Sequence, residues 1–218
     1  YAWVLRVTLN KLLSIFFLPF LVFASVQFDG VVNDEEWAGA QNYNLPFEID
    51  PSYNADAEHK TDVFIKHDEK YLYVAFKAYG NKDYIRANIR SRDGINWLDD
   101  QVAVGIDTFG DGRYYIRFAA NPLGSIGDNK VDNKDNFDGS YNVEFDAKAQ
   151  ITDYGYEVEF QIPFTSLNFP EIKTQEWKLM LSRKLYNKGL ESRYLNYKKI
   201  DGAGCIICQS TDSYLIDN

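Results

Sequence analysis

Residue types that carry enzyme chemistry are scarce in this sequence. The 218 residues include two histidines, two cysteines and one methionine. No arrangement of Ser, His and Cys supports a nucleophilic triad. A zinc site needs about four ligands, and His59 and His67 are far from both cysteines in the sequence. The sequence therefore offers no basis for a nucleophilic hydrolase or a zinc site.

Glycoside hydrolysis has simpler requirements, because it needs two suitably separated carboxylates. With 32 Asp and Glu residues, some such pair is expected by chance and is no evidence of catalysis. We therefore expect a domain that is not itself an enzyme. The parent protein would be the place for any associated glycoside hydrolase activity.

Basic residues are also in deficit, with 23 Lys and Arg against 32 Asp and Glu and a net charge of −9. Binding to phosphate backbones draws on clustered Lys and Arg, so we expect no nucleic-acid partner. An acidic balance favours solubility and identifies no ligand by itself.

The chain lacks a hydrophobic run of bilayer length. Its apolar stretch over residues 12–23 is interrupted by Ser14 and Pro19, whereas a membrane-spanning helix needs about 20 residues. Arg6 and Lys11 precede this stretch, and Ala24 ends it. This pattern predicts a secretory signal peptide over residues 1–24, with a retained anchor as the alternative. We expect an exported protein of the periplasm, the outer membrane or the cell surface.

The two cysteines stand close together, as Cys205-Ile206-Ile207-Cys208. A c-type haem motif would require a histidine at the position of Gln209. A thioredoxin-type site is unsupported, because no βαβ pattern surrounds the motif. In an exported protein we expect a structural role, as a local disulfide or as two reduced thiols.

What the chain has in abundance is period-two alternation. Val102, Val104 and Ile106 share one face of a run that ends at a Gly-Asp-Gly turn, and Tyr114, Ile116 and Phe118 share a face of the run that follows. Two alternating runs across a glycine turn predict an antiparallel hairpin.

The same pattern recurs along the chain. It predicts strands over 72–78, over 144–152 paired with 156–162, and around 177–181, with a further strand at 192–197. Residues 81–91 are expected to form a short helix or loop, and 164–167 a helical turn. Short strands without a long amphipathic helix predict an all-β fold, an antiparallel β-sandwich with short helical turns. We assign residues 25–200 to this domain. The glycine-rich residues 201–218 are expected to be a linker or the start of a C-terminal region.

The domain opens on a turn that includes several acids. Asn33 or Asp34 is placed to cap a short helical turn with Glu35 and Glu36 in its first positions. We expect Trp37 and Ala38 to face inward and this segment to close one end of the sandwich.

A candidate ligand site lies where the chain enters the central hairpin. Trp97 is followed closely by Asp99 and Asp100. An aromatic ring can stack on the apolar face of a sugar, and fixed carboxylates can accept hydrogen bonds from its hydroxyls. The alternative is structural, with the ring plugging the sandwich edge and the carboxylates capping local backbone groups.

A second candidate is the acidic loop over residues 127–139. Its carboxylates are Asp128, Asp132, Asp135 and Asp138. Calcium takes six to eight oxygen ligands, so such a density of oxygens is a candidate Ca²⁺ site. The spacing does not match an EF-hand, and two lysines dilute the charge, so a solvated loop is the alternative. We expect no other cofactor.

Four segments carry a resemblance to a known family. They are Phe28-Asp29-Gly30 with Glu36-Trp37; Asp62-Val63 with Leu72-Tyr73-Val74; Asp99-Asp100 through Ile106-Asp107-Thr108-Phe109 with Asn121-Pro122-Leu123-Gly124; and Tyr156-Glu157-Val158-Glu159 with Ile162-Pro163-Phe164 and Ser166-Leu167. Together they span nearly all of residues 27–185. The chain resembles the family 9 carbohydrate-binding modules, and more closely the family-9-like domain at the N-terminus of large exported bacterial proteins.

The resemblance implies a β-sandwich that binds an oligo- or polysaccharide without catalysis, in an exported protein linked to carbohydrate catabolism. It also implies an outer-membrane barrel in the C-terminal part of the same polypeptide. In sugar-binding members two tryptophans sandwich a terminal sugar ring, and Trp97 matches the first of them. Trp177 and Trp37 have structural explanations, so Tyr79 or Tyr141 is a candidate for the second position.

Two alternatives belong to other functional classes. The first is a structural or docking domain of an outer-membrane protein that binds no sugar. The second is a haem-binding redox subunit of related fold, which would use an axial ligand such as Met180, the one methionine. Met180 lies on the face opposite Leu179 and Leu181, where packing explains it equally well.

Overall fold

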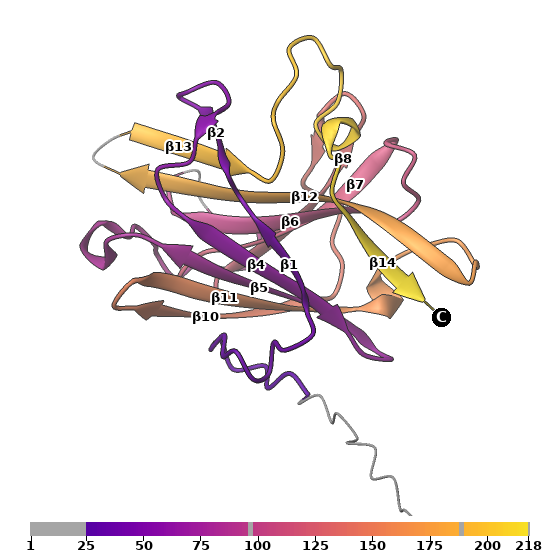
Figure 1. Cartoon of the computed structure of the whole chain (residues 1–218), viewed down its shortest axis with the longest axis horizontal. Helices are drawn as coiled ribbons and strands as arrows, with labels where there is room; N and C mark the ends of the chain where they lie inside the picture. Colours follow the sequence, from indigo (N-terminus) through magenta and orange to yellow (C-terminus); the bar gives the residue numbers. More distant parts are fainter. Residues whose placement is uncertain (1–24, 96–97, 188–189, 218) are drawn as a thin grey trace, which may run out of the picture.

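Two antiparallel sheets pack face to face in the computed structural model, which describes residues 25–95, 98–187 and 190–217 (Figure 1). The first sheet has five strands, in the order β1 (Gln41–Asn44), β4 (Thr61–His67), β5 (Tyr71–Tyr79), β11 (Gly155–Pro163) and β10 (Asp146–Thr152). The predicted antiparallel β-sandwich is confirmed.

The second sheet has nine strands. Its order is β3 (Ala55–Asp56), β2 (Phe47–Asp50), β13 (Leu190–Leu195), β12 (Thr174–Asn187), β6 (Gln101–Asp107), β7 (Tyr114–Ala120), β8 (Ile126–Asp132) and β9 (Phe137–Asp138), with β14 (Ser213–Asp217) also paired to β12. Short 3₁₀ turns connect the strands at η1 (Lys82–Tyr84), η2 (Phe164–Ser166) and η3 (Ile207–Gln209).

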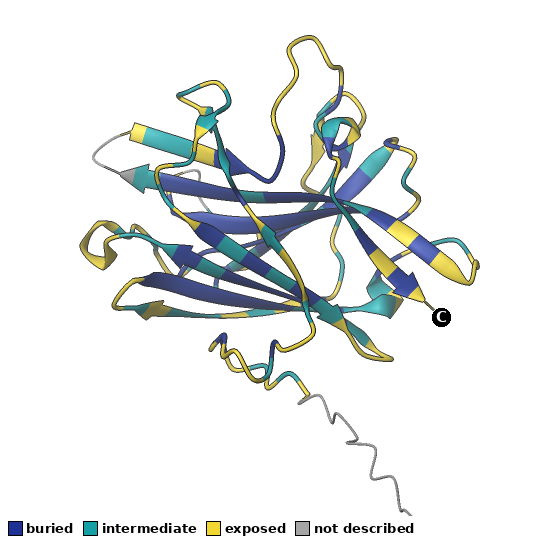
Figure 2. Cartoon of the chain, in the orientation of Figure 1, coloured by how far each residue is buried: buried dark blue, intermediate teal, exposed yellow. Residues whose placement is uncertain are grey.

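The core lies between the sheets and is built by the alternation seen in the sequence (Figure 2). In the β6–β7 hairpin Val104 pairs with Phe118 and Ile106 with Ile116, and all four side chains enter the core. Successive strand residues point to opposite faces, so their neighbours point away from it. The predicted central hairpin is therefore confirmed. Tyr114, predicted to share the face of Ile116 and Phe118 in the core pair, is half-buried at the start of β7 and lies outside the core cluster.

The acidic segment after β7 differs from its prediction. Residues Ile126–Asp132 form β8, which pairs along its whole length with β7, and only part of the predicted loop stays irregular. The polar composition suggested a loop. The exposed backbone groups of β7 nevertheless provide a complete set of hydrogen-bonding partners for an adjacent strand.

The sandwich also continues past residue 200. Strand β14 pairs with the first half of β12, and Tyr214 and Ile216 reach the core. Cys205 and Cys208 are joined by a disulfide, as one of the two expected alternatives. The segment expected to be a linker therefore packs as part of the domain as far as residue 217.

The opening segment covers the outer face of the five-stranded sheet rather than closing an end of the sandwich (Figure 1). Asn33 caps its turn, since Asn33 Oδ1 accepts the Glu36 N–H at 2.9 Å. Trp37 is buried as expected, but Ala38 is exposed. Ala38 lies on the solvent side of the turn, so it cannot share the inward orientation of Trp37.

Two carboxylates from β11 fix this segment. Glu159 accepts the N–H groups of Asp29 and Gly30 and the Nε1–H of Trp37, at 3.1, 2.8 and 3.1 Å. Glu157 accepts the Val32 N–H at 3.1 Å. Both carboxylates are buried, because the segment lies over them.

No helix within the described residues is long and apolar enough to cross a membrane. The signal peptide predicted over residues 1–24 lies outside the part of the chain that the structure describes.

Candidate functional site

The outer face of the nine-stranded sheet is hollowed beside the central hairpin. Because Val102 and Phe118 point into the core, the adjacent residues Gln101, Arg117 and Ala119 point to this outer face. Small residues among them leave room above the strands. The loop over residues 196–212 rises beside this face and returns the chain to β14 (Figure 1).

Two adjoining depressions lie on this face. The first, called here the polar hollow, has a volume of about 220 Å³ and is lined by Asp93, Ile95, Gln101, Arg117, Ala119, Gly127, Asp128, Asn129 and Gly139. The second, called here the apolar hollow, has a volume of about 200 Å³, and its apolar lining residues include Ile49, Tyr115, Phe137, Met180, Leu195 and Ile206. Gln101 and Arg117 line both.

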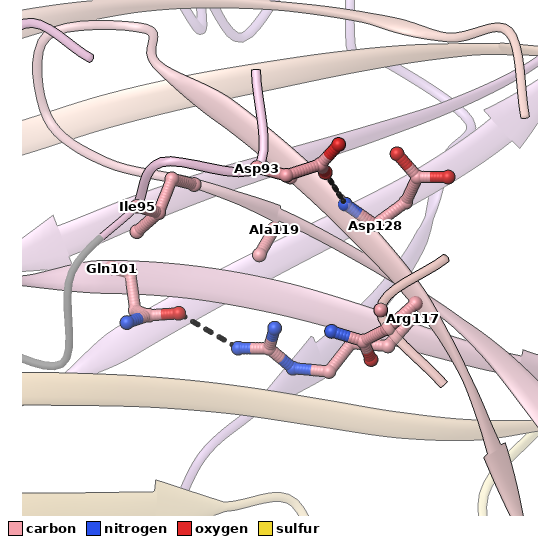
Figure 3. A pocket seen from close by; sticks show the side chains of 9 residues that line it. Asp93, Ile95, Gln101, Arg117, Ala119 and Asp128 are labelled. Atoms are coloured by element: carbon pink, nitrogen blue, oxygen red, sulfur yellow. Dashed lines mark hydrogen bonds between the residues drawn. The ribbon is translucent and has the colours of Figure 1, made fainter. Parts of the chain in front are cut away.

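Arg117 stands at the junction of the two hollows. Its guanidinium donates a hydrogen bond to Gln101 Oε1 at 2.8 Å (Figure 3). Burial, together with repulsion from Arg193, lowers the pKa of Arg117. No carboxylate of residues 25–95, 98–187 or 190–217 forms an ion pair with it. The junction thus presents N–H donors to the hollows.

Hydrogen bonds between loops hold one wall of the polar hollow. Asp93 Oδ1 accepts the Asp128 N–H at 3.1 Å (Figure 3). The Asp128 carboxylate accepts bonds from Arg92 Nη2 at 2.6 Å and from the Val143 N–H at 2.8 Å. Burial raises the pKa of Asp128, although these bonds oppose the shift. Asp128 therefore links two loops to the sheet.

Asp99 and Asp100, two predicted sugar-binding residues, are fully buried. Asp99 accepts hydrogen bonds from Asn88 Nδ2 at 2.9 Å and Arg90 Nε at 3.4 Å. Asp100 Oδ1 accepts the Tyr186 N–H at 2.7 Å. Both carboxylates are therefore used to hold the start of β6, as the structural alternative expects. Their contact with a sugar stays a prediction.

Trp97, the third predicted residue, lies outside the described residues. Ile95 before it and Gln101 after it both line the polar hollow. The segment that carries Trp97 therefore begins and ends at this hollow.

Burial raises the pKa of Asp100 from its ordinary value of 3.8 to about 6. The carboxyl proton of Asp100 is therefore held more tightly in the folded state than in the unfolded state. The contribution of this proton to the free energy of unfolding is fully present below pH 4 and is lost as pH rises through 6. Relative to Asp100→Asn, the free energy of unfolding of the wild type should fall by about 2–3 kcal/mol between pH 4 and pH 7. Urea unfolding of both proteins at each pH measures it, and a constant difference between them would contradict the assignment.

None of the tryptophans that the structure describes is placed to act as the second aromatic ring of the expected sugar site. Trp37 and Trp177 are both buried. Tyr79 lies against Tyr154, with ring centroids 5.3 Å apart, and the ring of Tyr141 packs against the core. Tyr115 and Phe137, which the sequence interpretation did not single out, do line the apolar hollow. The alternation in the sequence places Tyr115 on the face of its strand that points away from the core, and this was the available indication that it lines an outer site.

The four aspartates of the predicted calcium site are not brought together. Asp132 binds back to Asn136, Asp138 to Ser140, and Asp135 accepts the Ile206 N–H at 3.0 Å. Within the described part of the chain, no three His, Cys, Asp or Glu side chains gather as a metal ion requires. Calcium binding by this set stays a prediction that the geometry does not favour.

Met180 packs in a buried cluster with Tyr115, Leu195 and Ile207 on the outer side of the nine-stranded sheet. It faces away from Leu179 and Leu181, as predicted. Packing accounts for its position, and neither His59 nor His67 belongs to this cluster.

An antiparallel β-sandwich with a polar and aromatic hollow on one outer face is the architecture of a ligand-binding domain. The chain belongs to the carbohydrate family 9 binding domain-like family, whose profile matches residues 28–195. The predicted family is therefore confirmed.

Solved structures share the fold at low sequence identity. A family 9 carbohydrate-binding module from Caldicellulosiruptor kristjanssonii in complex with cellotriose is 15% identical with a TM-score of 0.62, covering 89% of this chain and 90% of that one. A module from the same organism in complex with glucose is 16% identical with a TM-score of 0.59, covering 89% and 92%. A putative carbohydrate-binding protein from Bacteroides uniformis is 12% identical with a TM-score of 0.61, covering 82% and 86%. A comparison with curated proteins gives no match.

Proposed function

We propose that this chain is a non-catalytic domain that binds a glycan in the polar and apolar hollows. The observation that carries the proposal is the junction of Gln101 and Arg117 between a polar wall and an aromatic one. Binding sites for sugars combine a few fixed polar groups with an aromatic surface. The family membership and the ligands in the titles of two structural relatives support the same class of ligand.

Trp97 is proposed to stack on the sugar ring. The support is its chain position, since Ile95 and Gln101 on either side of it line the polar hollow. Asp99 and Asp100 then act as positioning residues, because their hydrogen bonds hold the segment that follows Trp97. Their carboxylates need not touch the sugar for this role.

Titration calorimetry with a panel of oligosaccharides tests the proposal. The wild type should bind at least one of them, and Trp97→Ala should weaken that binding by about tenfold or more, because a stacking ring often dominates an interface. Phe109→Ala is the matched control. Phe109 is an exposed aromatic at the opposite end of β6, and its loss should leave affinity unchanged.

Failure of the folded wild type to bind any glycan of the panel would refute the proposal. It would favour the alternative, a docking domain of a surface protein. Binding that survives in Trp97→Ala would refute only the role of that ring.

We further propose that the protein is exported and serves carbohydrate catabolism at the periplasm, outer membrane or cell surface. The basic and apolar pattern of residues 1–24 supports export, and a disulfide between Cys205 and Cys208 suits an oxidising compartment. Mass spectrometry of the mature protein should find an N-terminus near residue 25. Retention of residues 1–24 would contradict cleavage.

A further inference from the structure

Positive side chains form a row across the outer face of the nine-stranded sheet. In the strand register Lys184 of β12 lies opposite Gln101 of β6 on one side and opposite Arg193 of β13 on the other. The Arg117 guanidinium of β7 reaches the same row through its hydrogen bond to Gln101. Three cations from three strands therefore meet beside the apolar hollow, and all three line it.

The negative charge in this row is smaller than the positive charge. Glu191 pairs with Lys184 at 3.6 Å and with Arg193 at 2.5 Å, and Asp50 approaches Arg193 at 3.9 Å. Arg117 has no such partner among the residues that the structure describes. This excess of positive charge is local, because the whole chain has a net charge of −9.

The apolar hollow would strengthen an interaction with Arg117. Tyr115, Met180 and Leu195 are buried there, and Phe137 and Ile206 complete the apolar lining. Charges attract more strongly next to apolar atoms than in open water. Removing a guanidinium from water costs free energy, and without a carboxylate partner part of that cost is not compensated. An anionic ligand can compensate it by forming a bidentate pair with the guanidinium.

The two carboxylates of the polar hollow are already engaged by groups of the protein other than Arg117. Asp128, one of its two carboxylates, is paired with Arg92 at 2.6 Å. Asp93 accepts the backbone N–H of Asp128. An anionic group on the ligand is therefore best accommodated at Arg117, on the side of the apolar hollow.

We propose that the glycan bound here is anionic, with a carboxylate or a sulfate ester on the sugar that occupies the apolar hollow and pairs with Arg117. This inference rests on the proposed function and specifies its ligand class. The aromatic and aliphatic lining of the hollow contacts the C–H face of the sugar ring. The row of Arg117, Lys184 and Arg193 binds the negative charge of its carboxylate or sulfate. A neutral sugar could satisfy the first requirement but not the second.

Three oligosaccharides of equal length test the inference by calorimetry with the full chain. They are an oligogalacturonate (carboxylates), a sulfated galactan fragment (sulfate esters) and a cello-oligosaccharide (neutral). The wild type should bind one of the anionic ligands about tenfold or more tightly than the neutral one, as expected for a charge-assisted hydrogen bond. This preference should shrink as salt is raised, because salt screens charges. The carboxylate and sulfate arms identify which anion is recognised.

Substitutions locate the charge recognition. Arg117→Gln should weaken anionic binding by about tenfold and neutral binding by less than about threefold. Arg193→Gln, at a half-exposed residue, should reduce the anionic preference without risk to the fold. The matched control is Arg113→Gln, which removes the same charge from an exposed turn of the same hairpin and should change neither affinity.

The two levels of failure can be told apart. Equal binding of anionic and neutral oligosaccharides, or equal losses for both in Arg117→Gln and Arg193→Gln, would overturn the anionic inference and leave carbohydrate binding intact. Binding to none of the three ligands and to no other glycan would overturn the proposed function, and the present inference with it.

Discussion

Gly155→Ala should lower the free energy of unfolding by about 4 kcal/mol, one of the largest losses expected for a single substitution in this domain. Gly155 has a φ of +142°, a conformation that residues with a Cβ rarely adopt. A Cβ at this position would lie 2.0 Å from the Ala78 carbonyl oxygen. That oxygen belongs to the backbone of β5, which pairs with β11 from Gly155 onward.

The clash cannot be relieved by rotating a side chain. Either β5 or the turn before β11 must move, and the Gly80 N–H that donates to the Tyr154 carbonyl at 2.9 Å would move with it. Urea unfolding followed by circular dichroism measures the loss. Gly204→Ala is the matched control, because nothing lies within 4 Å of its Cβ position and its φ is not left-handed. A loss below about 1 kcal/mol in Gly155→Ala would show that the β10–β11 turn or strand β5 adapts at little cost.

The central strands could be predicted from the sequence because their information is local. A glycine turn sets the pairing of β6 with β7, and alternate apolar residues decide which face is buried. The same holds for β10 and β11, which pair as predicted, although Gly155 pairs with Thr152 and the turn is therefore one residue shorter than the predicted 153–155. In each case one hairpin contains both the strands and the turn that aligns them.

The elements that the sequence did not reveal depend on distant partners. Strand β8 has a polar composition, with Asp128, Asn129 and Lys130 in succession, and becomes a strand because β7 is beside it. Strand β14 is defined by pairing with the start of β12, about 40 residues earlier. The sequence of a short polar segment does not indicate that the unpaired edge of a distant strand is available to pair with it.

The candidate site was only partly predictable for the same reason. The sequence drew attention to the start of β6, which does border the polar hollow. The buried carboxylates of Asp99 and Asp100, however, accept hydrogen bonds from the side chain of Asn88 and the backbone N–H of Tyr186. The row of Arg117, Lys184 and Arg193 comes from three strands, and only the sheet register and the bond from Arg117 to Gln101 bring it together.

Glu159→Ala should cost about 4 kcal/mol of unfolding free energy, because it leaves three donors, two of them buried, without their acceptor. Those donors are the N–H groups of Asp29 and Gly30 and the Nε1–H of Trp37. Residues 25–40 should also become sensitive to protease, since this carboxylate joins two parts of the segment, residues 29–30 and Trp37, to β11. Unfolding in urea and limited proteolysis followed by mass spectrometry measure both effects. Glu35→Ala removes an exposed carboxylate of the same segment and should change neither.

The same variant separates the roles of the two outer faces. Residues 25–40 cover the five-stranded sheet, whereas the hollows with Arg117 lie on the outer face of the other sheet, across the whole core. If the hollows are the binding site, Glu159→Ala should keep its glycan affinity within about twofold at temperatures where it stays folded, since distant sites act independently. Loss of glycan binding in folded Glu159→Ala would instead place the ligand at the opening segment. One pair of measurements, stability and affinity on the same protein, therefore decides which face of the sandwich serves the ligand.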